Sequence, residues 1–372
     1  MAITLSTITA NEVYGVRSPL PLGFQSDGIG EVLKTISVSL KIWNGDKTTN
    51  KPSTVTYTIS LSEDTLGSTL TYYEVDIAEL VREYINTDNF NYPTTYAGAW
   101  AAWVEIDWTA TNGGDTEFTG TPTVICTNGY REYEDDTLAL DTYYFPSDIK
   151  VPEDRSYIIS VLDKGVTGAS RVVDSVEIKY DASATATTNF GTAGTTTASL
   201  FKTATLTWGA SDTFADINLK LSSSIVHTFR VYKFCKTKYE NITIGYVNRV
   251  GVVDYQNFFG KVERRMSAQR ETYKPALDNN YTNANAQFRI LKANGKKSIT
   301  TNTDWVAEET SGKMQDLLLT EYAFETQGSG ESEEVKAITP RDSEITLKVD
   351  NNELVNYTLN FDYAYNHINS VR

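Results

Sequence analysis

Alternation of apolar and polar residues recurs along this chain and most narrows the folds that it can adopt. Between residues 35 and 42 every second side chain is apolar, and residues 55–61 repeat the pattern. Because successive side chains of a β-strand point to opposite faces, this period of two predicts strands with one buried and one solvated face. The turn-forming sequence Asn44-Gly45-Asp46 lies between the two runs and predicts an antiparallel pair. The fold class is therefore mainly β.

The chain is too long for one ordinary small domain. Its 372 residues predict two or three compact domains, each with its own core. We expect antiparallel β-sandwich-like domains with two short helices. Two prolines, Pro146 and Pro152, mark an extended boundary. The predicted division is an N-terminal β-sandwich over residues 1–148, a middle β unit over 149–226 and a C-terminal β-rich domain over 227–372.

Two segments show the period of a helix instead. Near residues 76–86, Asp76 and Glu79 have the spacing of a capping box and precede an apolar stripe, so this helix is expected to cap the N-terminal sandwich. Near residues 305–320, Met314 and Leu317 fall on one helical face. The sequence thus predicts one helix in the first domain and one in the last.

Two further segments have distinctive patterns. Residues 182–200 are rich in Thr, Ala and Gly and almost free of charge, which predicts either a flexible excursion or a segment ordered only against a neighbouring subunit. Residues 345–361 alternate on both sides of the turn residues 350–352, which predicts a closing hairpin. The acidic residues within 328–334 predict an exposed loop.

Charge and hydropathy exclude several classes of partner. The formal net charge of −15 leaves no overall basic surface for a phosphate backbone, so direct nucleic-acid binding is not expected. The first ten residues lack the basic and continuous apolar regions of a secretory signal, and no stretch approaches the ~20 apolar residues of a membrane helix. We therefore expect synthesis in the cytoplasm without a signal peptide and no membrane insertion.

Residues that commonly carry catalysis are sparse. The chain has two histidines, His227 and His367, and a metal site or triad based on histidine would need both to converge. It has no phosphate-binding loop, dinucleotide fingerprint or nucleophile elbow. Cys126 and Cys235 are predicted to be buried thiols. We predict no catalytic residue, no metal site, no cofactor and no enzymatic activity.

Carboxylates and tryptophans leave two alternatives open. Glu105 and Asp107, with the acidic pair at 135–136, are the nearest approach to a glycosidase acid–base pair, although their alternation is typical of the polar face of a sheet. Trp100 and Trp103 are candidates for stacking on a glycan, although core positions are favoured for them. A glycan is therefore kept only as an alternative partner.

A more specific pattern begins at Asn248, where the sequence Asn-Arg-Val-Gly leads to an aromatic strand ending at Phe259 and then to a charged strand at 263–273. This pattern resembles tail and baseplate-region structural proteins of tailed bacteriophages, particularly phages of Bacteroidota. Similar features follow in the same order: Trp305-Val306 before a helix, three leucines at 317–319 and a last strand at 357–361. The similarity lies mainly in residues 241–361 and is looser at residues 75–85.

The resemblance implies a virion structural protein of the tail, baseplate or neck that acts by subunit assembly. Its partners would be copies of itself and other virion proteins, bound through sheet faces and strand edges. Two alternative functions stay open: a carbohydrate-binding or adhesin module, and a glycan-degrading tail enzyme. The excursion at 182–200 is one expected contact element. The candidate contact residues are Asn248, Arg249, Gly251, Tyr255, Phe258, Phe259, Trp100 and Trp103.

Overall fold

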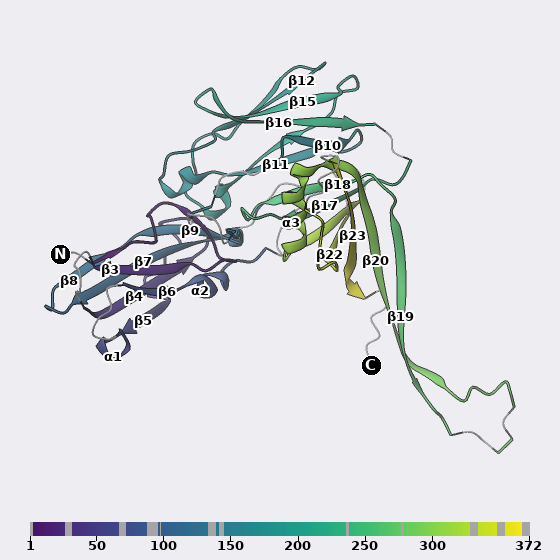
Figure 1. The fold of residues 1–372 in the computed structure, drawn as a ribbon, viewed down its shortest axis with the longest axis horizontal. Helices are drawn as coiled ribbons and strands as arrows, with labels where there is room; N and C mark the ends of the chain where they lie inside the picture. Colours follow the sequence, from purple (N-terminus) through teal and green to yellow (C-terminus); the bar gives the residue numbers. More distant parts are fainter. Residues whose placement is uncertain are drawn as a thin grey trace. The chain divides into compact units, whose positions relative to one another are not determined.

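The chain folds mainly into strands, as the alternation predicts (Figure 1). The computed structural model describes residues 3–26, 32–66, 72–87, 96, 98–132, 139–140, 145–235, 238–276, 279–280, 282–327, 334–347 and 354–366. The chain divides into two compact units, Met1–Phe234 with Val247–Asp254, and Cys235–Tyr246 with Tyr255–Arg372. The mainly β fold class is confirmed. The structure groups the chain into two units where the sequence predicted three domains.

The first part of unit 1 is a sandwich of two sheets, which we call the N-terminal sandwich (residues 3–132). One sheet has the strand order β1-β3-β6, and the other has the order β2-β9-β7-β4-β5, with β8 paired to β7. The elements are β1 (Ile3–Leu5), β2 (Val13–Gly15), β3 (Pro21–Ser26), β4 (Leu33–Trp43), β5 (Tyr57–Leu61), α1 (Glu63–Leu66), β6 (Tyr72–Asp76), α2 (Ala78–Arg82), η1 (Gly98–Trp100), β7 (Ala101–Asn112), β8 (Glu117–Gly120) and β9 (Thr123–Thr127).

The core of this sandwich lies where the sequence places it. The apolar residues of β4, from Ile36 to Ile42, are almost fully buried together with those of β7. The predicted antiparallel pairing of β4 with β5 is present, with Ile36 opposite Leu61. Across the two sheets, the rings of Phe24 and Trp108 meet edge to face at 5.5 Å. Burial of such side chains contributes about 1.5–3 kcal/mol each.

Helix α2 covers this core but differs from the prediction. It runs over Ala78–Arg82 and is shorter than the expected 76–86, and its N-cap residue Ile77 makes no side-chain cap. The predicted capping box is therefore wrong. Asp76 still serves the helix start, because its Oδ1 accepts from the Ala78 N–H at 3.0 Å and from the Leu20 N–H at 2.9 Å.

The second part of unit 1 has a five-stranded sheet in the order β10-β16-β15-β12-β13 and a two-stranded sheet of β11 and β14. Its elements are β10 (Asp148–Pro152), β11 (Tyr157–Leu162), η2 (Lys164–Thr167), β12 (Ser175–Tyr180), β13 (Ala186–Asn189), η3 (Thr197–Leu200), β14 (Phe201–Leu206), β15 (Phe214–Leu221) and β16 (Ser224–Phe234). The predicted boundary after residue 226 falls inside β16. The prediction placed residues 149–226 and residues 227–372 in different domains. In the structure β10 and β16 are parallel neighbours in one sheet, with Asp148 opposite Arg230, so no boundary separates them.

Residues 182–200 find partners within their own chain. Strand β13 pairs with β12, and the Thr196 side chain accepts from the Ser199 N–H at the start of η3. Thr197 exchanges two hydrogen bonds with Gly45, one to the Gly45 carbonyl and one from its N–H, both at 2.9 Å. The segment is therefore neither a free excursion nor dependent on a neighbouring subunit for its order.

Unit 2 is built on a seven-stranded sheet in the order β18-β17-β21-β22-β23-β20-β19. The elements are β17 (Ile242–Val247), β18 (Val253–Phe258), β19 (Glu263–Tyr273), β20 (Arg289–Ala307), η4 (Glu308–Thr310), α3 (Ser311–Leu319), β21 (Ala323–Gln327), β22 (Glu334–Pro340) and β23 (Leu354–Asn366). Met314 and Leu317 of α3 are buried in one cluster with Phe258, Ile299 and Phe361. That cluster forms the core of the unit.

Two predicted elements of unit 2 need correction. The helix near 305–320 begins only at Ser311, because Trp305 and Val306 continue β20 and pair with residues of β23. The closing hairpin is wrong in its first arm, since residues 341–347 form no strand and β23 pairs with β20 and β22 instead. Its turn, residues 350–352, lies outside the described residues. Within the described part of the chain, no helix is both long and apolar enough to cross a membrane.

Candidate interaction surface

The structure places most of the predicted contact residues in the interior. Arg249 is half-buried and forms an ion pair with Glu132 at 2.6 Å. The other candidates, which are buried, are Asn248, Gly251, Tyr255, Phe258, Phe259, Trp100 and Trp103. These seven side chains or backbone positions belong to the packing of the fold and do not form an exposed contact surface.

The turn from Asn248 to Gly251 shows why a conspicuous motif can be structural. The Asn248 side chain accepts from the Val250 N–H at 3.0 Å, and Gly251 has a φ of +84°, which favours glycine. A Cβ at Gly251 would also meet Thr127 Oγ1 at 2.7 Å. The Tyr130 N–H donates to the Arg249 carbonyl at 2.8 Å. The turn therefore fits tightly against residues 127–130 of the same unit.

The two tryptophans are core residues of unit 1. The Trp103 ring stacks on Trp43 at 6.4 Å, and its Nε1 donates to the Gly45 carbonyl at 3.1 Å. Trp100 meets Tyr96 and Phe201 edge to face, at 5.1 and 6.2 Å. Neither ring is available to a glycan.

Among the residues that the structure describes, the carboxylates considered for glycoside hydrolysis do not form an acid–base pair. Glu105 lies between Lys41, at 3.1 Å, and Lys51. Partial burial opposes the charge of Glu105, but the hydrogen bonds from Lys51 and Lys41 outweigh it and lower the pKa of the carboxyl. Asp107 is exposed, and residues 135–136 and 328–333 lie outside the described residues. Glu105 is thus held as an ion, whereas a catalytic acid needs a raised pKa.

The histidines and cysteines also stay apart. His227 lies on β16, where burial lowers the pKa of its imidazole, and His367 is outside the described residues. Cys126 is buried, which raises the pKa of its thiol, but Cys235 is exposed, contrary to the prediction. Among the residues that the structure describes, no group of three or more His, Cys, Asp or Glu could hold a metal ion.

An exposed surface of a different kind lies in unit 2. We call residues 261–298 the basic arm, since β19 and the first half of β20 form a ribbon there, with Glu263 opposite Thr300 and Tyr273 opposite Arg289. Strand β23 pairs with this ribbon only at its base, at Lys296 and Ser298. Ten of the eleven β19 residues are exposed, on both faces of the ribbon. Figure 1 shows the ribbon continuing past the other strands of its sheet. A two-stranded ribbon without a core is only marginally stable in water.

The charge of the basic arm is opposite to that of the chain. It has nine Lys or Arg and three Asp or Glu, a net charge of +6 within a chain of −15. Residues 1–147 have seven Lys or Arg and twenty Asp or Glu, a net charge of −13. The two signs are therefore segregated into different parts of the sequence.

Apolar side chains accompany these charges on the basic arm. Met266, Phe288, Ile290 and Leu291 are 53, 62, 57 and 46% exposed, and Tyr273 is exposed as well. Apolar residues on an uncovered ribbon are typical of a surface that a partner covers. Aromatic residues, Met and Arg are also the residue types enriched in protein interfaces.

A buried carboxylate fixes the base of the basic arm. Glu325 of β21 is fully buried and accepts from Arg264 Nη2 at 2.8 Å and from the Tyr363 hydroxyl at 2.6 Å. Arg264 also binds Glu240 at 2.9 Å. Burial opposes the charge of Arg264, but the hydrogen bonds to Glu325 and Glu240 outweigh it and raise its pKa. Burial, and then the bond to Glu325, raise the pKa of Tyr363.

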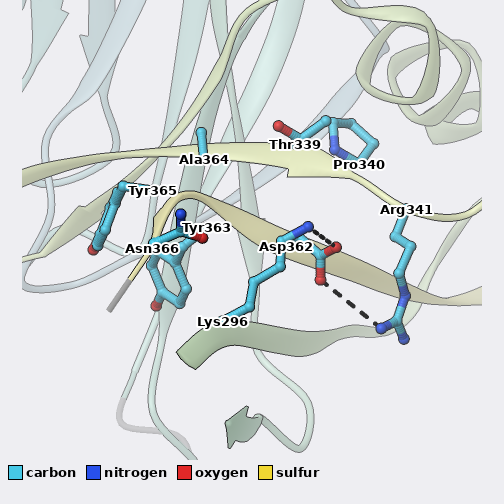
Figure 2. A pocket seen from close by; sticks show the side chains of 9 residues that line it. All are labelled: Lys296, Thr339, Pro340, Arg341, Asp362, Tyr363, Ala364, Tyr365 and Asn366. Atoms are coloured by element: carbon cyan, nitrogen blue, oxygen red, sulfur yellow. Dashed lines mark hydrogen bonds and ion pairs between the residues drawn. The ribbon is translucent and has the colours of Figure 1, made fainter. Parts of the chain in front are cut away.

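Two open depressions lie beside this base. Figure 2 shows the first, of about 480 Å³, in which Asp362 faces Lys296 at 2.8 Å and Arg341 at 3.8 Å. The second, of about 350 Å³, is lined by Arg264, Arg265, Lys297 and Lys336 together with two tyrosines. Both are open, and polar and apolar atoms line them in similar proportion, whereas small-molecule sites are mostly enclosed and apolar. They suit the side chains of a macromolecular partner better.

Sequence reasoning did not single out the basic arm as a contact surface. Its signal was present, because residues 263–273 have charged and polar side chains at both strand phases and so lack the alternation of a half-buried strand. The concentration of cations in one short segment of an acidic chain was the second signal. The charged strand at 263–273 enters the prediction only through the resemblance.

Comparison with known proteins does not assign a family. No protein-family model and no curated protein sequence matches the chain. Similar solved structures include trypsin-activated alpha-2-macroglobulin from Escherichia coli (10% identity, TM-score 0.23) and the periplasmic chaperone SfaE (7%, 0.20). Another is dimeric latent PorU from Porphyromonas gingivalis (12%, 0.22).

The alignments cover 81, 63 and 90% of this chain respectively, and 19, 100 and 33% of those proteins. The chain thus spans less than two thirds of the length of two of the three. At these TM-scores, the similarities carry no functional argument.

Proposed function

We propose that this chain is a structural protein of a tailed-phage virion, in the tail, baseplate or neck, and that it acts by binding copies of itself and other virion proteins. The observation that carries the proposal is the basic arm. Its strands expose charged and apolar side chains on both faces and have no core of their own. Such a ribbon gains most of its stability by being covered.

Two further features support assembly as the function. The resemblance to phage tail and baseplate-region proteins, mainly in residues 241–361, includes the charged strand of the basic arm at 263–273. The base of the arm is fixed by the buried Glu325 and its bonds to Arg264 and Tyr363. An anchored ribbon needs less ordering when it binds, and ordering is one of the main costs of association.

No specific observation favours either alternative function, the carbohydrate-binding module or the glycan-degrading enzyme. The tryptophans considered for glycan binding, Trp100 and Trp103, are buried. Of the carboxylates considered for glycan hydrolysis, Glu105 is paired with two lysines and Asp107 is exposed beside it. We therefore propose neither.

The test is to locate the chain in phage particles. An antibody raised against the purified chain should label one fixed position on the tail, baseplate or neck in electron micrographs, and preimmune serum should label none. Mass spectrometry of gradient-purified particles should find the chain at a constant ratio to the capsid protein. If intact, infectious particles lack the chain by both methods, the virion proposal is wrong.

A further inference from the structure

The basic arm and the N-terminal sandwich carry opposite charge: the arm has a net charge of +6, and residues 3–132, with seven Lys or Arg and sixteen Asp or Glu, have a net charge of −9. We infer that the basic arm of one copy binds the acidic edge of the N-terminal sandwich of a second copy. By acidic edge we mean the exposed carboxylates Glu63, Asp64, Glu74, Glu79 and Glu83. This inference rests on the proposed assembly function and names the partner that the basic arm takes.

The register of the ribbon distributes cations over both of its faces. Residues directly opposite in an antiparallel pair share a face, so Met266 and its partner Lys297 lie on one face, with Arg264 and Arg270 at the same strand phase. Arg265, Lys292 and Lys296 lie on the other. The exposed Met266 adds apolar area to the first face. On the second face Arg265 pairs with Glu263, Lys296 pairs with Asp362 and Lys292 lies opposite Glu271. A partner that covers the face of Met266 and Lys297 therefore meets the stronger positive charge.

The carboxylates of the acidic edge lie on or close in sequence to two edge strands of the sandwich. Strand β5 is an edge strand of one sheet and β6 an edge strand of the other, and the Tyr57 hydroxyl of β5 donates to Glu83, just after α2, at 2.6 Å. Glu74 lies on β6 and Glu79 on α2, while the one cation among residues 72–86 is the half-buried Arg82. Edge strands also present unpaired backbone N–H and C=O groups, with which a strand of a second copy can pair.

Complementary charge favours a second copy over nucleic acid. Without the +6 of the basic arm, the rest of the chain has a net charge of −21, which repels a phosphate backbone. The same negative charge attracts the arm of another copy and suppresses other docking orientations. Because the arm and the acidic edge are different surfaces, each copy has one of each. Such head-to-tail contacts build a ring if the rotation closes and a helical filament if it does not.

Self-association of the purified full-length chain tests the inference. Sedimentation velocity should show concentration-dependent oligomers at low salt and monomers at high salt, since exposed charge pairs are screened. Arg270→Glu with Lys297→Glu, on one face of the arm, should weaken association by about tenfold or more. Lys150→Glu with Lys179→Glu is the matched control, because it makes the same charge change at two exposed residues of the five-stranded sheet.

A mixing experiment makes the assignment specific. Glu74→Lys with Glu79→Lys changes the charge of the five carboxylates of the acidic edge from −5 to −1 and should weaken self-association by about tenfold or more, as the arm variant does. When the two variants are mixed, the glutamates at 270 and 297 of the arm variant can pair with the lysines at 74 and 79 of the edge variant, and the unchanged arm of the edge variant can bind the unchanged edge of the arm variant. Mixed oligomers should therefore form at concentrations at which each variant alone stays monomeric. Urea unfolding and circular dichroism confirm that both variants are folded.

Three outcomes would overturn the inference. The inference is wrong if the chain does not associate at any salt or concentration, if the arm variant associates like the control, or if labelled DNA binds the arm of a chain that does not self-associate. Each leaves the virion proposal intact if the particles contain the chain. Conversely, suppose that the chain forms head-to-tail oligomers but is missing from phage particles. The inference that the basic arm binds a second copy would then stand, and the proposal of a virion protein would be wrong.

Discussion

Strand pairs β4–β7 and β19–β20 are both antiparallel, but the first is buried in a core and the second is exposed. In the first pair, Val38 and Trp108 lie opposite each other and both are buried in the sandwich core. In the second pair, Met266 and Lys297 lie opposite each other and both are exposed. Alternation of apolar residues therefore reports which face of a strand is buried. It does not report whether the strand forms.

The continuity of β20 explains how the second pair can exist. Its C-terminal half, from Ile299 to Val306, regains buried positions and pairs with β23 inside the seven-stranded sheet. Its N-terminal half continues the same backbone path beyond the core and pairs with β19. The core thus fixes one end of the ribbon, and hydrogen bonding extends it.

The largest expected effect is on the free energy of unfolding, and it distinguishes the buried pair β4–β7 from the exposed pair β19–β20. Ile106→Ala in β7 removes a fully buried side chain and leaves a cavity, so we expect a loss of about 2–5 kcal/mol in the free energy of unfolding of unit 1. Met266→Ala on the basic arm should change the free energy of unfolding by less than about 0.5 kcal/mol. Urea titrations followed by tryptophan fluorescence measure both. Equal losses would show that the arm is covered within its own chain.

A smaller effect is expected where the arm meets its core. Glu325→Gln replaces the buried carboxylate bonded to Arg264 and Tyr363, and hydrogen bonds to a charged group are worth about 1.5–3 kcal/mol. We expect a loss of that order in unit 2 and faster amide hydrogen exchange in β19. Glu344→Gln, at an exposed carboxylate of the same unit, is the control. Unchanged exchange in β19 would mean that Glu325 does not anchor the arm.

Local patterns predicted local structure well and distant pairing poorly. The alternation of Ile36 to Ile42 predicted β4 and its buried face, because neighbouring residues decide both. The parallel pairing of β10 with β16 was not predictable, since no local feature joins residues so far apart in sequence. Alternation also misled, because Ile345 and Leu347 alternate without forming a strand while β22 takes the place next to β23.

Prediction of the interaction surface failed for a related reason. Aromatic residues suit both a core and an interface, and a sequence does not distinguish these roles for Trp100, Trp103 or Phe258, all of which are buried. The charges of the basic arm and of residues 1–147 were readable from the sequence. Their meaning required the structure, which shows that the arm has no core of its own.

The smallest expected effect compares one carboxylate of each strand pair as pH changes. Glu105 on β7 has a pKa lowered below its ordinary value of 4.5: partial burial opposes this, but the hydrogen bonds from Lys51 and Lys41 outweigh it. Glu263 on β19 also has a lowered pKa, through its bond to Arg265, but its side chain is 45% exposed, against 14% for Glu105. The more buried Glu105 should therefore contribute more to stability.

A lowered pKa stabilises the fold above the unfolded-state value, and the contribution disappears as pH falls through the folded-state value. We therefore expect Glu105→Gln to cost about 0.2–1 kcal/mol at pH 7, and its urea midpoint to converge with that of the unmodified chain as pH falls below 4.5. Glu263→Gln should shift the midpoint less. If Glu263→Gln instead shifts it as much as Glu105→Gln, the ribbon is shielded from solvent and the contrast between the two strand pairs does not hold.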